Sequence, residues 1–508
     1  MNKKKIIETA ISAASGRDAR KNRERIWTGT GTIKGVNMGN KLQSVSKQRR
    51  AALAVTFCLA AGQISAQTVM SYDADRTGVP DQGGSATRNW NGPNWTTDNG
   101  ASYTNWVDGS IARFNEGTAA QGVTMSNTAG KTLGGIIKDG TANSFTTLSG
   151  YGGTLTLADG AAIKLNNNSG SLLSLENGVL AGNNVVVAGT AANGRLRLGT
   201  GASTDTYANT LNGLTISNGT VTLQKADNVA AVNGAVTLAG GTLNLTNHNQ
   251  FGAGSTLTQN GGVIAFGAKT QTISELTIRS GTHTASAGSA VNLNGADALT
   301  LRNVDLNAGI TVNLSSNGAQ TVRFDAVSNS TASVGAMVFS GGIKTFNIEN
   351  GNVTTDMIVK SNITESASSS LTKTGAGKLA LWREVDISGD LLINEGSILL
   401  AGQSAFNFTI GANGVNNGVK GTGAAAFEGQ FKFDLTQAGD TVGDSWLVVD
   451  ATNLTETYGT TFSVNGFTDA GGGKWIKEQA GCRYEFDKGT GRLTTTGGKG
   501  RLRLTIIH

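Results

Sequence analysis

The sequence is poor in the residues that build disulfide-stabilised domains and many metal or catalytic sites. Among 508 residues there are two prolines, two cysteines and three histidines, and charged residues make up 15%. Cys58 lies in an apolar N-terminal segment that we expect to be removed, so Cys482 has no partner for an intramolecular disulfide. His248 and His283 stand far apart and His508 is terminal, which excludes the close histidine spacing of common zinc sites. Stability must therefore come from packing.

The net charge of +6 does not describe the body of the chain. Residues 1 to 66 carry 13 Lys and Arg against 3 Asp and Glu, which gives +10. The other 28 basic and 32 acidic residues give −4 for residues 67 to 508. Because this body is mildly acidic and has no basic stripe with interleaved aromatic residues, nucleic acid is excluded as a partner.

Glycine, with 72 residues, is abundant instead, and short β-branched segments recur about every 20 residues, as one three-sided coil of a parallel β-helix requires. The clearest turn glycines are Gly219, Gly241, Gly261 and Gly281. Alternating apolar residues, as in 154–157, favour strands with one buried face over disorder. Turn asparagines that could stack their amides between coils are Asn218, Asn233, Asn260 and Asn294. The sequence predicts an all-β fold, a right-handed parallel β-helix (β-solenoid).

The first 66 residues have the anatomy of a leader with a secretory signal peptide. A basic stretch that ends at Arg50 precedes an apolar run at 51–61, which is too short to span a bilayer. Small residues follow, and we expect cleavage between Ala66 and Gln67 with export of the mature chain. The basic residues at the start leave two alternatives, an unusually long leader or a true start at Met38.

Aromatic residues divide the mature chain. Residues 67–118 hold both prolines and three of the seven tryptophans, and no tryptophan follows until Trp382. We expect an aromatic-rich N-terminal cap over 67–118, a β-solenoid over 119–427, and a C-terminal β cap with its tail over 428–508. Such caps are needed because an open solenoid end exposes core and unpaired strand edges.

One segment, residues 371–402, carries a recognisable repeat pattern. Its residues are Leu371, Lys373, Gly375, Gly377, Leu379, Leu381, Asn394 and Gly396. This pattern resembles the autotransporter-associated β-strand repeat of bacterial autotransporter passengers. The link Trp382-Arg383-Glu384-Val385 departs from the family, which usually carries Ser-Gly and an Asn-x-Tyr turn at this place. The resemblance implies export to the cell surface on a β-helical stalk.

The resemblance does not extend to a secretion machine. Autotransporters end in a membrane β-barrel, and the 108 residues that follow residue 400 are too few to form one. We therefore expect a passenger-like protein without the C-terminal β-barrel. It would be released or anchored by a partner, unless the natural chain is longer.

Acidic residues near the repeat are the best candidates for chemistry. Parallel β-helices also carry polysaccharide lyases and hydrolases, which need carboxylates, alone or with Arg and Lys, on neighbouring rungs of one face. The candidates here are Glu384, Asp386, Asp390 and Glu395. Basic residues stand close to them in the sequence, so solvated surface charge is the simpler interpretation.

We predict an exported, non-enzymatic β-solenoid, associated with the cell surface or outer membrane or extracellular, without catalytic, metal or cofactor-binding residues. Its partners would be the export machinery and a surface or extracellular ligand, such as a polysaccharide or a host or matrix protein, and no nucleic acid. The alternative is a β-helical polysaccharide lyase or glycoside hydrolase. Acidic and basic side chains from three adjacent rungs that converge in a groove would favour the enzyme.

Overall fold

The computed structural model describes residues 67–497 apart from short gaps. The gaps are 74–75, 77–85, 117–121, 127–129, 141–144, 150–152, 167–171, 190–193, 303–305, 317, 325–331 and 361. All elements of the described part are β-strands. The described residues contain no helix that is long and apolar enough to cross a membrane. The predicted signal peptide, with Ala66 and the alternative start Met38, lies outside the described residues, and Gln67 is exposed.

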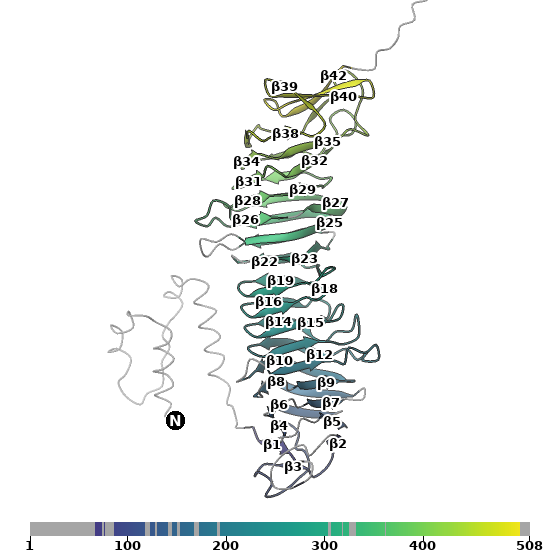
Figure 1. Ribbon diagram of the computed structural model, residues 1–508, viewed down its shortest axis with the longest axis vertical. Helices are drawn as coiled ribbons and strands as arrows, with labels where there is room; N and C mark the ends of the chain where they lie inside the picture. The colour runs from purple at the N-terminus through teal and green to yellow at the C-terminus, as the bar shows by residue number, and fades with distance from the viewer. Residues whose placement is uncertain are drawn as a thin grey trace, which may run out of the picture. The chain divides into compact units, whose positions relative to one another are not determined.

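The strands stack in parallel into a β-solenoid, which confirms the predicted fold class (Figure 1). Each turn of the coil places strands on three faces. The first face begins with a nine-stranded sheet of β2 (Ala86–Asn89), β5 (Gly122–Ser126), β7 (Phe145–Ser149), β9 (Leu172–Glu176), β11 (Arg195–Leu198), β13 (Thr220–Leu223), β15 (Thr242–Leu245), β17 (Val263–Ala265) and β20 (Thr282–Thr284). It continues with the start of β25 (Ala332–Ile348), β26 (Met357–Val359), β28 (Lys378–Leu381), β31 (Ser397–Leu400), β34 (Ala424–Phe427) and β37 (Thr455–Tyr458).

Long strands carry the chain around the corners, and β25 contributes to all three faces. The second face contains the first halves of β6 (Lys131–Gly140), β8 (Thr154–Leu165) and β10 (Val179–Ala188), and later β18 (Thr270–Ile273), β21 (Ala290–Leu293), β23 (Leu306–Leu314), β25, the start of β27 (Ile363–Thr374), β29 (Glu384–Val385), β32 (Ala405–Thr409), β35 (Gln430–Asp434) and β38 (Ser463–Val464).

The third face is also a long column of strands. It contains β1 (Val69–Tyr72), β4 (Ile111–Glu116), the second halves of β6, β8 and β10, then β12 (Thr210–Ile216), β14 (Asn233–Leu238), β16 (Thr256–Gln259), β19 (Glu275–Ile278), β22 (Asp297–Leu301), β24 (Gln320–Phe324), the ends of β25 and β27, β30 (Leu391–Ile393) and β33 (Val419–Gly421). The chain therefore returns to each face once per turn.

The predicted period is present in the strand register of the first face. Thr220 pairs with Thr242, Thr242 with Val263, and Val263 with Thr282, so successive turns are 22, 21 and 19 residues long. In each of these strands the half-buried or exposed residues alternate with more deeply buried ones. This alternation places Leu, Ile and Val inside the coil on every turn and builds one continuous core.

The corner before these strands is a column of glycines. Gly219, Gly241 and Gly281 have φ of 81°, 73° and 119°, as turn positions require. The prediction is wrong at one position, because Gly262, with φ 69°, occupies the corner in place of Gly261. The reason is register, since each of the corner glycines, Gly281 included, directly precedes the first residue of a first-face strand.

Aromatic clusters lie near both ends of the stack, as the sequence predicts. Near the N-terminal end, β3 (Trp95–Thr96) pairs antiparallel with β1, and the Trp95 ring packs 4.8 Å from Trp90, 4.7 Å from Trp106 and 5.2 Å from Tyr72. Trp90 and Trp95 are fully buried. The rings thus cover the core below the first turns.

The C-terminal end combines parallel and antiparallel strands. Parallel pairing continues past residue 427 as far as β38. Beyond it lies a five-stranded antiparallel sheet of β36 (Ser445–Leu447), β42 (Arg492–Gly497), β41 (Cys482–Asp487), β40 (Lys474–Gln479) and β39 (Thr468–Gly471). Phe431 packs 4.9 Å from Phe462 and 5.7 Å from Phe486, which joins the last turns to this sheet. The handedness of the coil stays a prediction.

Candidate binding surface

The structure brings the repeat-motif residues together at the corner between the third and first faces. Leu371 on β27, and Leu379 and Leu381 on β28, point into the core and are fully buried. Asn394 is exposed, and its backbone nitrogen donates a hydrogen bond to the Lys373 oxygen of the turn below. The motif leucines are therefore packing residues.

Lys373 is the charged member of the motif and is also fully buried. Its Nζ donates hydrogen bonds to the backbone oxygens of Thr374, Gly375 and Glu395, at 2.8, 2.7 and 3.2 Å. Burial lowers the pKa of Lys373 to about 8, although the carboxylates of Glu395 and Asp356 oppose this. The lysine thus satisfies corner carbonyls of its own turn and of the next one, which is a structural role.

The motif glycines allow these corners to stack closely. Gly375 and Gly396 have φ of 74° and 64°. A Cβ atom on Gly396 would lie 2.4 Å from the Gly377 oxygen, and one on Gly377 would lie 2.4 Å from the Glu349 oxygen. Gly377 has no left-handed φ, so close approach of the neighbouring backbone alone requires glycine there.

Three more fully buried lysines, Lys138, Lys225 and Lys344, were missed from the sequence, and Lys138 Nζ donates a hydrogen bond to the Asp139 backbone oxygen at 2.9 Å. Lys225 Nζ lies 2.8 Å from Asp205 Oδ1 and 2.9 Å from the Gly178 oxygen. Burial lowers the pKa of Lys225, and the hydrogen bond that its ammonium donates to Asp205 opposes this shift. Lys344 Nζ donates to Gln320 Oε1 at 2.8 Å, and burial lowers its pKa to about 8. Lys344 alternates with the buried Phe346 and Ile348 along β25, and this alternation could have predicted that its side chain points into the core.

The acidic candidates are used in separate contacts. Glu384 Oε1 accepts hydrogen bonds from Lys432 Nζ and Asn407 Nδ2, both at 2.8 Å, and the Lys432 bond is the main reason why the pKa of Glu384 is lowered. Asp390 forms an ion pair with Lys420 at 2.6 Å. The other two candidates take no part in these ion pairs. Glu395 Oε2 accepts a hydrogen bond from the Gly375 nitrogen, and Asp386 is exposed.

No described group of three His, Cys, Asp or Glu side chains is arranged to hold a metal ion. His248 Nδ1 accepts a hydrogen bond from the Thr270 nitrogen, and His283 Nε2 bonds to Gln259 Oε1. Cys482 is buried and unbonded to sulfur. These residues are therefore tied to their local strands and corners.

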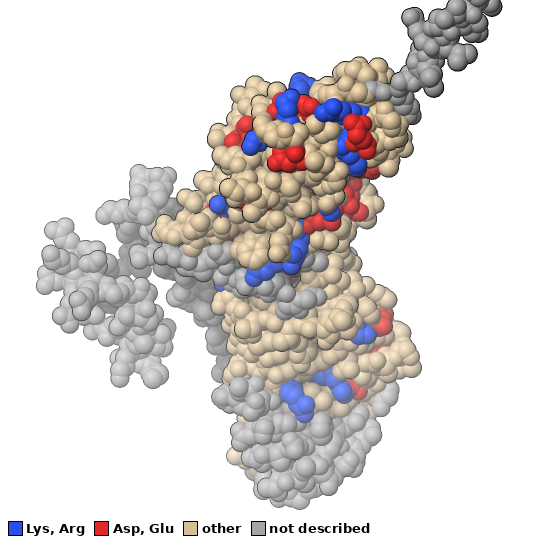
Figure 2. Space-filling view, turned by 45° about the horizontal axis from the view of Figure 1, so that its top comes forward, with Lys and Arg blue, Asp and Glu red and all other residues tan. Residues whose placement is uncertain are grey.

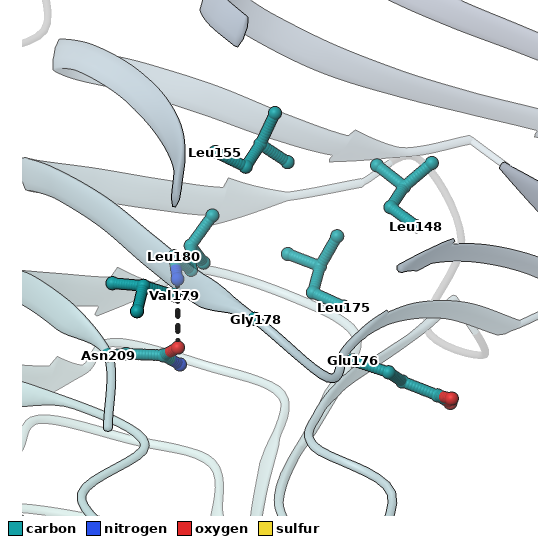
Figure 3. Close-up of a pocket in the computed structure, with 8 residues that line it drawn as sticks. All are labelled: Leu148, Leu155, Leu175, Glu176, Gly178, Val179, Leu180 and Asn209. Atoms are coloured by element: carbon teal, nitrogen blue, oxygen red, sulfur yellow. Dashed lines mark hydrogen bonds between the residues drawn. The ribbon is translucent and has the colours of Figure 1, made fainter. Parts of the chain in front are cut away.

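Two cavities of the described part differ in size and in openness to solvent. One gap of about 10 Å³ lies in the core near β8, β9 and β10, where four leucines face one another and the Glu176 carboxylate points away (Figure 3). Asn209 closes it with a hydrogen bond to the Leu180 nitrogen at 2.9 Å. An open depression of about 510 Å³ lies over β39 and β40 at Thr468 and Lys477. The first has room for about one water molecule and is mainly apolar, so it is a packing defect.

A chain of side-chain hydrogen bonds runs from turn to turn along the second face, and we call it the amide ladder. Its members are Asn228, Asn249, Thr272, Asn292 and Asn313, joined by bonds of 2.7, 3.0, 3.2 and 2.6 Å. The predicted asparagines are not its members. Asn218, Asn233 and Asn260 instead bind the neighbouring backbone or an arginine. The five residues of the amide ladder bond to one another because the register of successive turns places them in one column.

A row of threonines follows the third face on five successive strands. Its members, Thr215, Thr237, Thr258, Thr277 and Thr300, pair in register and are half-buried between buried neighbours, which are apolar except for Gln259. Charge gathers elsewhere: in Figure 2 the middle of the stack is mostly tan, and blue and red atoms are densest at the C-terminal end. The middle of the coil thus presents a largely uncharged surface of hydroxyl groups and amides.

These two polar rows, on the third and second faces, are the candidate functional site, because each of them continues over several turns. Neighbouring side chains in each row repeat at the strand spacing of about 4.8 Å. Such a surface suits contact with an extended or repetitive partner. Comparison of the sequence with protein-family models and with curated proteins gives no match.

Proposed function

We propose that the protein is an exported, non-enzymatic β-solenoid that works at the cell surface or outside the cell, in contact with a polysaccharide or a matrix or host protein. The observation that carries this proposal is the uncharged, turn-by-turn surface formed by the threonine row and the amide ladder. A rod of this kind displays the same groups many times, which favours many weak contacts over a single pocket.

Two features of the sequence support export. The leader combines a basic stretch, a short apolar run and small residues before Gln67, as secretory signals do. The motif at residues 371–402 resembles the autotransporter-associated β-strand repeat, and its lysine and glycines occupy a stacked corner of the coil. We therefore place the chain with passenger-like surface proteins.

The alternative, a β-helical polysaccharide lyase or hydrolase, has less support. Its best acidic candidate, Glu384, is held by Lys432 and Asn407, and Asp390 is held by Lys420. A carboxylate whose pKa is lowered by a lysine is a poor general acid at neutral pH.

Export is tested on the full chain in the cell that makes it. Protease added to intact cells should digest the protein, and N-terminal sequencing of surface or secreted material should begin at Gln67. Material that is protected in intact cells and retains residues 1–60 would contradict the proposal.

The contact function is tested by binding of the purified chain to immobilised matrix proteins and polysaccharides. The triple variant Thr237→Lys, Thr258→Lys and Thr277→Lys places three charges on the threonine row, and we expect binding to fall several-fold. A control carries lysine at three exposed C-terminal threonines, Thr452, Thr460 and Thr468. Equal binding of both variants would remove the threonine row from the site. Release of reducing or unsaturated sugar from a polysaccharide would overturn the non-enzymatic assignment.

A further inference from the structure

Trp382 is a large aromatic side chain on the outside of the coil. It is 44% exposed, whereas Trp90, Trp95 and Trp446 are fully buried and Trp475 is 7% exposed. A tryptophan contributes a large apolar area when a partner covers it, so its exposure on this mainly polar surface points to contact with another molecule.

The position of Trp382 explains why part of its side chain stays uncovered. Trp382 follows β28 at the corner between the first and second faces, and Lys360 and Ala401 follow the strands below and above in register. Ala401 is small, and Gly402 comes next, where even an added Cβ would have no neighbour nearer than 3.5 Å. The turn above therefore places only small residues at this corner.

The residue that follows Trp382 is an arginine without an acidic partner among the described residues. Arg383 is exposed, and its Nη1 donates a hydrogen bond to Gln403 Oε1 at 3.2 Å. Among the described residues, no ion pair includes Arg383 or Lys360. A guanidinium in this state can bind a carboxylate through two parallel hydrogen bonds.

The combination matches the chemistry of a uronic acid. One face of a pyranose ring presents C–H groups that pack on an aromatic ring, and the carboxylate at C5 of a uronate carries the charge that Arg383 can pair. Gln403 offers an amide to the ring hydroxyls. We infer that Trp382, Arg383 and Gln403 form a binding site for uronate-containing polysaccharide, an inference that rests on the proposed contact function and names its ligand class.

The test uses the purified full chain and polygalacturonate oligosaccharides, with dextran as the neutral probe. Trp382→Ala should weaken polygalacturonate binding about tenfold or more, and Arg383→Gln several-fold, with loss of much of the salt dependence. The matched controls are Tyr207→Ala, which removes another exposed aromatic ring, and Arg279→Gln, whose arginine donates an equivalent 3.2 Å bond to Asn260. Both controls should bind within twofold of the unaltered chain.

Tryptophan fluorescence reports the site directly. The ligand should shift the emission of the unaltered chain to shorter wavelength and protect it from acrylamide quenching, and Trp382→Phe should lose this response but keep the fold. Binding of Trp382→Ala within twofold of the unaltered chain, or equal affinity for dextran, would overturn the inference. If the chain binds a matrix protein but not polygalacturonate, this site assignment fails and the proposed function stands. If the chain is retained inside the cell, the proposed function fails, whatever the oligosaccharide binding.

Discussion

Replacing a single corner glycine by alanine should separate backbone strain from close stacking of the turns. Gly241 lies in the glycine column before β15, and Gly254 lies in an exposed loop of the following turn. Their φ angles are 73° and 74°. A Cβ on Gly241 would lie 2.2 Å from the Gly219 oxygen, whereas a Cβ on Gly254 would meet no atom within 4 Å. The two substitutions therefore share the strain and differ in the contact.

The expected magnitudes follow from these two terms. The left-handed conformation costs a non-glycine residue roughly 1–2 kcal/mol, of which about 0.4–1 kcal/mol is recovered because alanine restricts the unfolded chain. Gly254→Ala should therefore lower stability only slightly. Gly241→Ala must also push the backbones of two turns apart, and overpacking of this kind costs roughly 1–3 kcal/mol more. That difference corresponds to about 5–150-fold in a local opening equilibrium.

Hydrogen exchange is the suitable assay, because each turn of a solenoid contacts only its neighbours and global unfolding of such arrays is not always two-state. In Gly241→Ala the amides of β13, β15 and β17 should exchange faster by that factor, while those of β28 and β31 keep their rates. In Gly254→Ala all five strands should exchange at nearly normal rates. Equal acceleration in the two variants would refute the argument that stacking, and not strain, demands glycine in the column.

Three further predictions concern polar groups. The pKa of Lys373 is about 8 in the folded chain and about 10.5 in the unfolded chain, so between these pH values the unfolded chain binds more protons at Lys373. The unfolding midpoint of the unaltered chain should therefore rise with pH relative to that of Lys373→Met. A difference between the two midpoints that stays the same over this pH range would show that the folded pKa is not lowered. Asp205→Ala leaves the Lys225 charge in the core without its partner, so the free energy of unfolding measured by denaturant titration should fall by roughly 3–5 kcal/mol. The control Asp434→Ala, at an exposed aspartate, should lower it by less than about 1 kcal/mol. Asn292→Ala removes two hydrogen bonds of the amide ladder and should lower the free energy of unfolding by about 1–2 kcal/mol. Hydrogen exchange should become faster only in β18, β21 and β23. Faster exchange spread evenly over the coil would contradict a local role.

The fold could be predicted because its causes are local and repeat. Residues such as Leu243 and Leu245 alternate with half-buried ones in a single strand, and the same phase returns after each turn. The corner glycines mark where each strand begins, and an error of one residue at Gly261 leaves the period intact. Trp90 and Trp95 near one end are equally visible in the sequence, since bulky rings suit a cap better than a regular turn.

The polar contacts could not be predicted because they depend on register between turns. Lys225 and Asp205 are 20 residues apart, and only the loop before β12 brings their charged atoms to 2.8 Å. Asn292 meets Asn313 because β21 and β23 pair without a shift, whereas an offset of one residue would turn one of the two amides to the other side of the sheet. Sequence spacing alone does not fix that offset.

The corner at Trp382 shows where a repetitive chain can acquire specificity. Lys373, Gly375 and Gly396 follow the repeat pattern and are needed by the turns above and below, because their atoms bond to or touch the neighbouring backbone. Any change at these positions is transmitted to the stack. Trp382 and Arg383 depart from the pattern, and their side chains are exposed and add no described bond to the backbone of another turn. A corner of this kind can change its side chains without loss of stacking, so selection on binding acts there with the least effect on stability. The departure from the repeat is thus a place where this chain can change its exposed side chains without loss of stacking.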